Sequence, residues 1–272
     1  MEKMQAQGYT KEDIFAQLEA MGAPRDRVVL MHSALRLIGR VEGGAEALLD
    51  ILIEYFTDKG GLFCVPTHTW RNMDKEFTLD MNDPHTCLGA FSDLAAADCR
   101  ATRTENPTHS MAVFGERERV EAFVKDEGRV LSGTAPDSCY GKLYDMGGYV
   151  LLVGVSHNRN TYLHSVDERI GVPNRLTKGF ADVAVKRADG TVFKHRMHTH
   201  YTDYCDDVSL RFPKYETPFR YHGAIKDGFV GSAPTQLCDA RIMKDVMEKI
   251  FLASKDTDPL VDECPIPTKL YC

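Results

Sequence analysis

The first half of the chain alternates between short apolar runs and amphipathic patterns. Val28–Met31 is a continuous apolar run, and Gly61–Val65 is a second one that stops at Pro66. Runs of this kind predict buried strands, whereas residues 45–56 between them repeat apolar positions at helical spacing. Two strands joined by one helix predict a βαβ unit, and therefore a protein of the α/β class.

Similar patterns predict further elements along the chain. Thr10 with Asp13 three residues later has the spacing of a helix N-cap, and Gly22 would end that helix. A strand covered on both faces is expected at 149–154, and helices are expected at 89–99, 116–126, 140–146 and about 234–253. The pair Asp189-Gly190 predicts a hairpin between 180–186 and 191–200, so we expect a mixed sheet.

Two segments, 67–88 and 100–109, show neither pattern. A long loop inside a compact domain is usually functional. These segments carry polar and aromatic side chains that could face a substrate, namely His68, Trp70, Asp74 and Glu105. An aromatic face close to a carboxylate would suit a cationic ligand.

The composition narrows the class of protein. With 43% hydrophobic residues in 272, the chain can bury a large core, and we expect one domain over residues 1–272. The net charge of -7 argues against a general nucleic-acid binder and suits a cationic small molecule.

Because no run of about 18 apolar residues occurs and the first residues are polar, we expect no membrane span and a cytoplasmic location. Eight cysteines without a CxxC pair argue against a zinc knuckle.

A glycine turn before the second helix is the first candidate site. Backbone amides at a helix N-terminus bind phosphate oxygens well where glycine, here Gly43 and Gly44, removes side-chain bulk. Ser33, Arg36 and Arg40 could add hydroxyl or guanidinium contacts to a diphosphate. The same turn could serve only as a connection, so both interpretations stay open.

The turn also contains Arg40-Val41-Glu42-Gly43-Gly44-Ala45, which fits the Arg-x-x-Gly-x-Ala pattern of GCN5-type acetyltransferases. Three fixed positions match easily by chance. That family runs a long strand straight into its loop, whereas residues 33–36 interrupt the strand here. We therefore do not assign the GCN5-type fold.

The strongest candidate for catalysis is the segment Thr161–Glu168, which follows the strand predicted at 149–154. In a helix, Asp167 and Glu168 lie on the same face as His164, three and four positions beyond it. A carboxylate that orients the imidazole makes it a general base near neutral pH. A lone pair of this kind is more often a solvated contact, but the position after a buried strand favours a ligand site.

Later histidines raise a different possibility, a metal site. They stand at positions 195, 198, 200 and 222, and His198 and His200 would share one strand face. Together with His164 and Asp167 they could form a metal-dependent hydrolase. Histidines on a charged hairpin are more often exposed, yet the residues alone leave this class open.

Several separated motifs together resemble the aminoglycoside 3-N-acetyltransferase family, also called the antibiotic N-acetyltransferase family, which is unrelated to the GCN5 type. They occur in family order from about residue 28 to about residue 170. The motifs are His32–Leu35 with Gly43–Ala45, Pro66-Thr67, Pro107–Ser110 with Gly115, Gly141–Leu143 leading into Leu151–Val155, and Thr161–Glu168.

This resemblance implies one α/β domain with a central mixed β-sheet flanked by helices. It also implies acetyl transfer from acetyl-CoA to an amine without a metal, typically to the 3-amino group of a 2-deoxystreptamine aminoglycoside. His164 would be the catalytic base, Asp167 the family's carboxylate and Glu168 its acidic neighbour. Residues that would contact the coenzyme are Ser33, Leu35, Arg36, Val41, Gly43 and Gly44, with Thr67 and Ser110 near its pantetheine arm.

Two positions depart from the family pattern. Asn106 replaces a usual His, and Asp167 replaces a usual Glu, so Glu168 is expected to share the carboxylate's role.

A non-catalytic sensor that binds acetyl-CoA is a third possible class. We expect neither a nucleic acid nor a membrane as partner, and the sequence leaves open which amine is the acceptor and whether the protein is a monomer or a homodimer.

Overall fold

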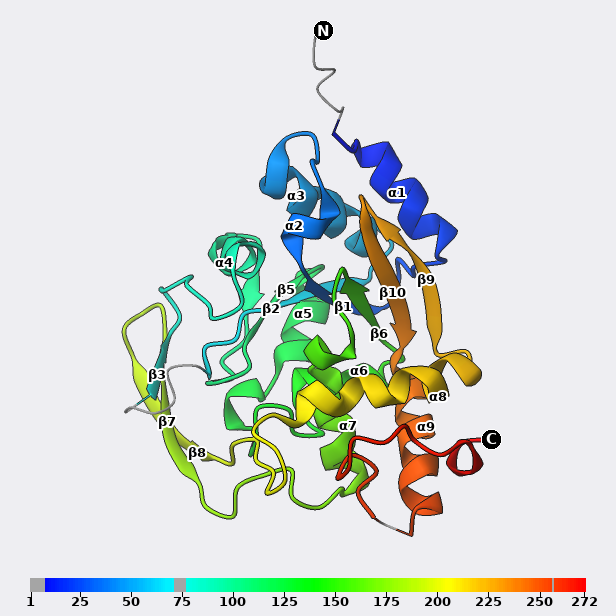
Figure 1. Ribbon diagram of the computed structural model, residues 1–272. Helices are drawn as coiled ribbons and strands as arrows, with labels where there is room; N and C mark the ends of the chain where they lie inside the picture. The colour runs from blue at the N-terminus through cyan, green and yellow to red at the C-terminus, as the bar shows by residue number, and fades with distance from the viewer. Residues whose placement is uncertain (1–7, 71–76, 256) are drawn as a thin grey trace, which may run out of the picture.

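A seven-stranded mixed β-sheet with helices on both faces forms the centre of the molecule (Figure 1). The computed structural model describes residues 8–70, 77–255 and 257–272. The spatial order of the strands is β4-β5-β2-β1-β6-β10-β9. Their bounds are β1 (Val28–Ser33), β2 (Leu62–Pro66), β4 (Thr102–Arg103), β5 (Met111–Phe114), β6 (Tyr149–Val153), β9 (Ile225–Val230) and β10 (Ala233–Asp239).

Nine α-helices belong to the described part of the chain: α1 (Lys11–Ala20), α2 (Leu35–Ile38), α3 (Gly44–Thr57), α4 (Ala90–Ala97), α5 (Arg117–Val124), α6 (Cys139–Asp145), α7 (Tyr162–Ile170), α8 (Glu216–Tyr221) and α9 (Ala240–Ala253). Short 3₁₀ helices cover Glu127–Arg129, His157–Arg159, Val208–Tyr215 and Thr268–Leu270. None of the helices within these described ranges combines the length and the apolar character needed to cross a lipid bilayer.

The central strands are apolar on both faces, because side chains of a strand alternate between the faces of its sheet. In β1, Val28 and Leu30 belong to the core that α5 to α9 cover, whereas Val29 and Met31 belong to the core under α1, α3 and α4. β6 alternates in the same way. The sequence-based prediction of a strand buried on both faces is therefore confirmed.

The predicted βαβ unit is confirmed as well. Helix α3 connects β1 to β2, which pair in parallel with Val28 opposite Leu62. At the N-terminus of α1, the amide of Asp13 donates to Oγ1 of Thr10 at 3.2 Å, and the amide of Thr10 donates to Oδ2 of Asp13 at 2.9 Å. This is the capping box that the sequence pattern indicates.

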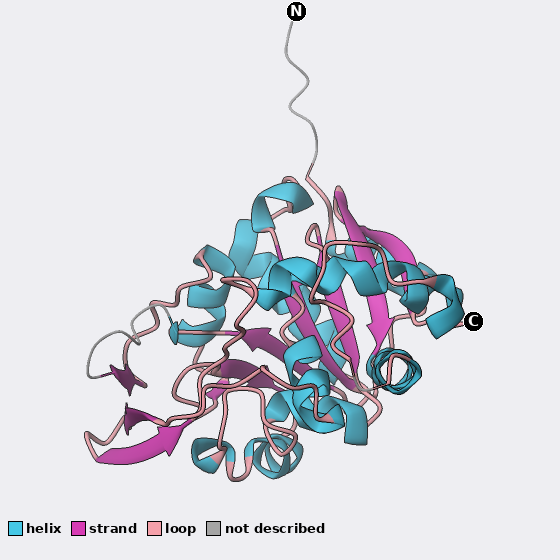
Figure 2. Cartoon of the chain, turned by 60° about the horizontal axis from the view of Figure 1, so that its bottom comes forward, coloured by secondary structure: helices cyan, strands magenta, loops and turns pink. Residues whose placement is uncertain are grey.

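The predicted hairpin forms, but it does not join the central sheet. Strands β7 (Ala181–Lys186) and β8 (Val192–Met197) pair with β3 (Phe77–Asp80) in a separate three-stranded sheet, at the lower left of Figure 2. β3 lies inside a segment for which the sequence predicted no regular structure. The central sheet is mixed for another reason, because β5 and β10 run antiparallel to their neighbours β2 and β6.

The predicted start of the last helix is wrong by six residues. The segment Ala233–Asp239 is strand β10, and α9 begins at Ala240. Alternate residues of this segment are buried, and Leu237 pairs with Leu151 of β6. The carboxylate of Asp239 accepts from the amides of Arg241 and Ile242 at 2.9 and 3.1 Å, and this cap fixes the true start of the helix.

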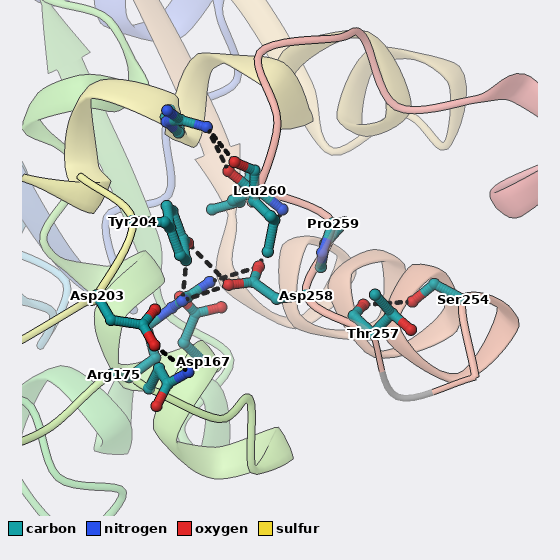
Figure 3. Close-up of polar contacts among 12 residues, drawn as sticks. Asp167, Arg175, Asp203, Tyr204, Ser254, Thr257, Asp258, Pro259 and Leu260 are labelled. Atoms are coloured by element: carbon teal, nitrogen blue, oxygen red, sulfur yellow. Dashed lines mark hydrogen bonds and ion pairs between the residues drawn. The ribbon is translucent and has the colours of Figure 1, made fainter.

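A buried arginine joins α7 to the C-terminal segment (Figure 3). Nε of Arg175 donates to Asp167 of α7 at 2.5 Å, and its Nη atoms donate to both oxygens of Asp258 at 2.7 and 2.9 Å. The hydroxyl of Tyr204 also donates to Asp258, at 2.7 Å. The side chains of Asp167, Arg175 and Asp258 are 0%, 3% and 5% exposed. One guanidinium therefore pairs with two carboxyl groups from distant parts of the chain.

The two carboxyl groups respond differently to this environment. Burial raises the pKa of Asp167 to about 6, against the opposing charge of Arg175. At Asp258 burial acts in the same direction, but hydrogen bonds from Arg175 and Tyr204 outweigh it and lower the pKa. Asp167 is therefore the member of the pair that depends more on its cation.

Replacing Arg175 by Met should destabilise the protein strongly at pH above neutral. The substitution keeps a long side chain but leaves two buried carboxylates unpaired, which should cost about 3–5 kcal/mol in the free energy of unfolding at about pH 8. Both carboxyl groups would then have folded-state pKa values above their unfolded values, so their protonated forms stabilise the fold and this stability is lost as pH rises. We expect a smaller cost at about pH 5, measured by urea unfolding at both pH values.

An exposed ion pair provides the control. Arg187 donates to Glu105 at 2.6 Å, and the two side chains are 47% and 34% exposed. Arg187→Met should cost less than about 1 kcal/mol at either pH. A cost for Arg175→Met that is equally small, or that is identical at both pH values, would contradict the proposed electrostatic role.

Candidate functional site

A cavity of about 950 Å³ lies at the carboxyl ends of the parallel strands β2, β1 and β6. Its walls are the segments that follow these strands, the loop before β5 and residues 198–209. Helix α3, which precedes β2, and helix α7, which follows β6, pack on opposite faces of the sheet. A crevice at this position in an open α/β sheet is where ligands bind.

His164 lies on α7 and lines the cavity. Its ring stacks on that of His200, with 4.1 Å between centroids and 10° between planes, and meets the edge of Phe212 at 4.8 Å. Burial lowers the pKa of His164 well below its usual value, and the neighbouring His200 and Arg175 act in the same direction. The imidazole is therefore neutral at pH 7, which is the form that accepts a proton.

The carboxylates predicted to orient His164 bind other groups. Asp167 is held by Arg175 at 2.5 Å. Glu168 accepts from Oγ of Ser132 at 2.5 Å and from Oγ1 of Thr134 at 2.6 Å. No hydrogen bond within the described residues reaches the ring of His164. The helical spacing is as predicted, but buried donors elsewhere in the fold attract both carboxylates.

Four histidines from separate segments form a histidine cluster in the cavity wall: His68, His109, His164 and His200. Ring centroids are 4.7 Å apart between His68 and His109, and 4.8 Å apart between His109 and His200. Nε2 of His68 is 2.6 Å from the hydroxyl of Tyr140. Burial lowers the pKa values of His68 and His109 well below their usual range, and the neighbouring histidines add to the shift. His68 and His109 therefore present neutral imidazoles to the cavity, as His164 does.

Three of the histidines considered as metal ligands, His195, His198 and His222, lie apart from this cluster. Nε2 of His195 contacts the carbonyl of Val130 at 2.8 Å, and Nε2 of His222 contacts that of Tyr271 at 2.6 Å. The ring of His198 packs on Phe180 with centroids 4.1 Å apart. Within residues 8–70, 77–255 and 257–272, no group of three or more His, Cys, Asp or Glu side chains is arranged to hold a metal ion. The geometry of the described residues gives the metal-dependent class no support.

The residues predicted to contact the coenzyme divide into three sets. Ser33, at the end of β1, and Arg36, in α2, line the cavity. Gly43 and Gly44 lie at the exposed N-terminus of α3 with φ of +79° and +78°, a conformation that favours glycine. Among the first amides of the 14-residue helix α3, that of Gly44 donates to the carbonyl of Val41 at 3.0 Å, and the next amides have no partner within the helix.

The third set lies inside the protein and does not line the cavity. Val41 is buried and Leu35 packs against the same core, under α1, α3 and α4. Thr67 and Ser110 are fully buried, and their hydroxyl oxygens are 2.9 Å apart. These four residues support the walls of the cavity from behind.

Only some of the residues predicted to contact the substrate line the cavity. His68 and Trp70 line the cavity, and Trp70 is 42% exposed. Glu105 lies outside the cavity lining, where it pairs with Arg187, and Asp74 lies outside the described residues. The lining contains two carboxylates that the sequence did not single out, Asp206 and Asp207. They come from a segment for which no pattern indicated a site.

His200 also lines the cavity at a place that the sequence did not indicate. It was considered only as a metal ligand, because nothing in the linear pattern connects it with His164. Nothing in the sequence pattern singles out Ser132 or Thr134. Only the packing of the segment after β8 against α7 brings these groups together.

Comparison with known proteins agrees with this architecture. The family model for aminoglycoside 3-N-acetyltransferase matches residues 30–252. The SPbeta prophage-derived aminoglycoside N(3')-acetyltransferase-like protein YokD of Bacillus subtilis (strain 168) is 25% identical over 264 residues, which cover 89% of this chain and 92% of the relative.

Solved structures show the same fold. A histidine-to-alanine mutant of aminoglycoside acetyltransferase AAC(3)-IVa in complex with apramycin superposes with a TM-score of 0.74, at 24% identity, over 96% of this chain and 100% of that chain. The structure of AAC-IIIb with CoASH superposes with a TM-score of 0.74, at 19% identity, over 92% and 98% of the two chains. The predicted fold is confirmed by these likenesses. The protein is an N-acetyltransferase and belongs to the aminoglycoside 3-N-acetyltransferase family.

Proposed function

We propose that the protein transfers the acetyl group of acetyl-CoA to an amino group of an aminoglycoside, the 3-amino group of the 2-deoxystreptamine ring or a related amine. The observation that carries this proposal is the neutral imidazole of His164 in the cavity at the carboxyl ends of β1 and β6. The names of the relatives, and the apramycin and CoASH complexes of the structural neighbours, support the two substrates.

His164 acts as general base in a ternary complex. An amine attacks the thioester carbonyl only through a free electron pair, so its nitrogen must give up a proton as the C–N bond forms. His164 accepts this proton directly or through a water molecule. Donors in the cavity wall stabilise the oxyanion of the tetrahedral intermediate, and holding both substrates in one cavity removes the entropic cost of their encounter.

Charge complementarity supports a cationic acceptor and an anionic donor. The guanidinium of Arg36 and the hydroxyl of Ser33 suit phosphate oxygens of the coenzyme, as do the free amides at the N-terminus of α3. Asp206 and Asp207 in the lining, and the net charge of -7, attract a cationic amine. The two substrates are thus favoured at different parts of the same site.

A thiol-release assay with acetyl-CoA distinguishes this function from its alternatives. The acceptor panel contains apramycin, gentamicin, sisomicin and simple primary amines. Release that depends on an acceptor amine and persists in a metal chelator supports acetyl transfer. Loss of activity with the chelator would indicate the metal-dependent hydrolase, and binding of acetyl-CoA without release would indicate a sensor.

Replacing His164 by Ala should lower kcat by at least about 100-fold, because the base that accepts the amine proton is lost. The dissociation constant for CoA should stay within about twofold, since the coenzyme contacts other residues. Steady-state kinetics and calorimetric titration measure the two quantities. His195→Ala is the control, because His195 lies outside the cavity lining and should retain wild-type kcat. Undiminished turnover in His164→Ala would remove His164 from the mechanism.

Replacing Gly44 by Val should weaken CoA binding about tenfold, because a branched side chain blocks the approach of a phosphate to the amides of α3. Gly190→Val is a matched control: Gly44 and Gly190 have φ of +78° and +85°, and a Cβ on either would meet no atom within 4 Å. Both variants therefore carry similar backbone strain. Equal CoA affinities for the two variants would show that the α3 turn does not bind the coenzyme.

A further inference from the structure

A chain of hydrogen bonds connects Glu168 to His200 beside the ring of His164. Oγ1 of Thr134 is 2.6 Å from Oε1 of Glu168 and 2.8 Å from Nε2 of His200. A hydroxyl has one hydrogen, and the carboxylate can only accept, so Thr134 donates to Glu168 and accepts from His200. The network therefore assigns the ring proton of His200 to Nε2 and leaves Nδ1 with a free electron pair.

His200 is thus the histidine of the cluster that a carboxylate orients. Its side chain is 20% exposed and lines the cavity, and its Nε2 is 3.7 Å from Oε1 of Glu168. This distance lets the carboxylate stabilise an imidazolium at His200 by charge as well as through Thr134. The sequence predicted that a carboxylate of α7 orients His164. In the structure, the carboxylate of Glu168 instead lies beside His200 and reaches it through Thr134.

Several titratable side chains face His200, and their charges affect how many histidines of the cluster can be protonated at once. Glu168 and His164 face it from α7, His109 from the loop before β5, and His68 lies behind His109 from the loop after β2. Because the rings of His164 and His200 stack at 4.1 Å, a proton on one opposes a proton on the other.

Acetylation of a primary amine requires two proton transfers from one nitrogen. The acceptor enters as an ammonium with three hydrogens on nitrogen and leaves as an amide with one. One proton must leave before attack, and the other leaves as the C–N bond forms. The thiolate of CoA takes up one proton when the C–S bond breaks, and the other proton passes to solvent. A wall that holds one proton at a time must release the first proton before it takes the second, and two acceptors that act in turn allow this.

We propose that His200 is a second catalytic histidine, which removes the first proton from the bound acceptor ammonium and releases it to solvent. His164 takes the second proton during attack and returns it to the departing sulfur. Thr134 and Glu168 are positioning residues, which hold the ring of His200 and stabilise its charge. The inference rests on the proposed acetyl transfer and assigns a separate residue to its first proton transfer.

The test measures kcat/KM for the acceptor at about pH 7 and about pH 9.5, with apramycin or the panel amine that the wild type acetylates fastest. Amines titrate between about pH 8 and pH 10, so at the higher pH the acceptor arrives largely deprotonated. His200→Asn should lower kcat/KM at least about 100-fold at neutral pH and less than about fivefold at high pH. His164→Ala should show the same large deficit at both pH values.

Two further variants make the result specific. Thr134→Val breaks the connection to Glu168 while keeping His200, and its deficit should also shrink at high pH. His195→Asn is the matched control, because His195 lies outside the cavity lining and its Nε2 contacts the carbonyl of Val130. That variant should stay within about twofold of the wild type at both pH values. If His200→Asn does not fold, the pH dependence of Thr134→Val decides the question.

The outcomes separate this inference from the proposed function. A deficit in His200→Asn that is the same at both pH values overturns the role of His200 and leaves acetyl transfer intact. Absence of wild-type turnover with every amine of the panel overturns acetyl transfer and, with it, this inference. A pH-dependent deficit in His200→Asn and Thr134→Val, beside a pH-independent one in His164→Ala, supports the assignment.

Discussion

Burial of the three parallel strands on both faces is the constraint on which the rest of the structure depends. β2, β1 and β6 contact an apolar core above and below, so most of their side chains must be apolar. Polar residues gather at the carboxyl ends of these strands and just beyond them, at His32, Ser33, Thr67 and Ser156. The hydrophobic effect that forms the sheet thereby concentrates the chemistry at one edge. The cavity is a consequence of how the core is packed.

The sequence predicted those parts of the site that follow directly from local pattern. The strand at 149–154, the helix that carries His164 and the glycine turn before α3 all come from periodicity and capping signals that neighbouring residues determine. It could not predict the partners of Asp167 and Glu168, because Arg175, Ser132 and Thr134 reach them only through tertiary packing. The error at β10 has a similar origin: its short apolar pattern precedes a true helix, and pairing with β6 decides its conformation.

The two neighbouring acids of α7 show how one helix can serve stability and the site at once. Asp167 faces the interior and pairs with Arg175, whereas Glu168 faces the hydroxyls of Ser132 and Thr134 beside the cavity. Neighbouring positions of a helix point about 100° apart, so adjacent residues reach different surroundings. Asp167 therefore belongs to the buried ion pair, and Glu168 is the carboxylate that lies next to the histidines.

The link between Arg175 and Asp258 also has a consequence for protein synthesis. Residues leave the ribosome in order, and Asp258 emerges long after the helix that contains His164 and Asp167. Until it does, Arg175 has only one of its two carboxylates, and β9 and β10 have only just become available to complete the sheet. The helix that carries His164 thus reaches its final environment only after Asp258 has been synthesised, so the nascent chain cannot complete these contacts before that point.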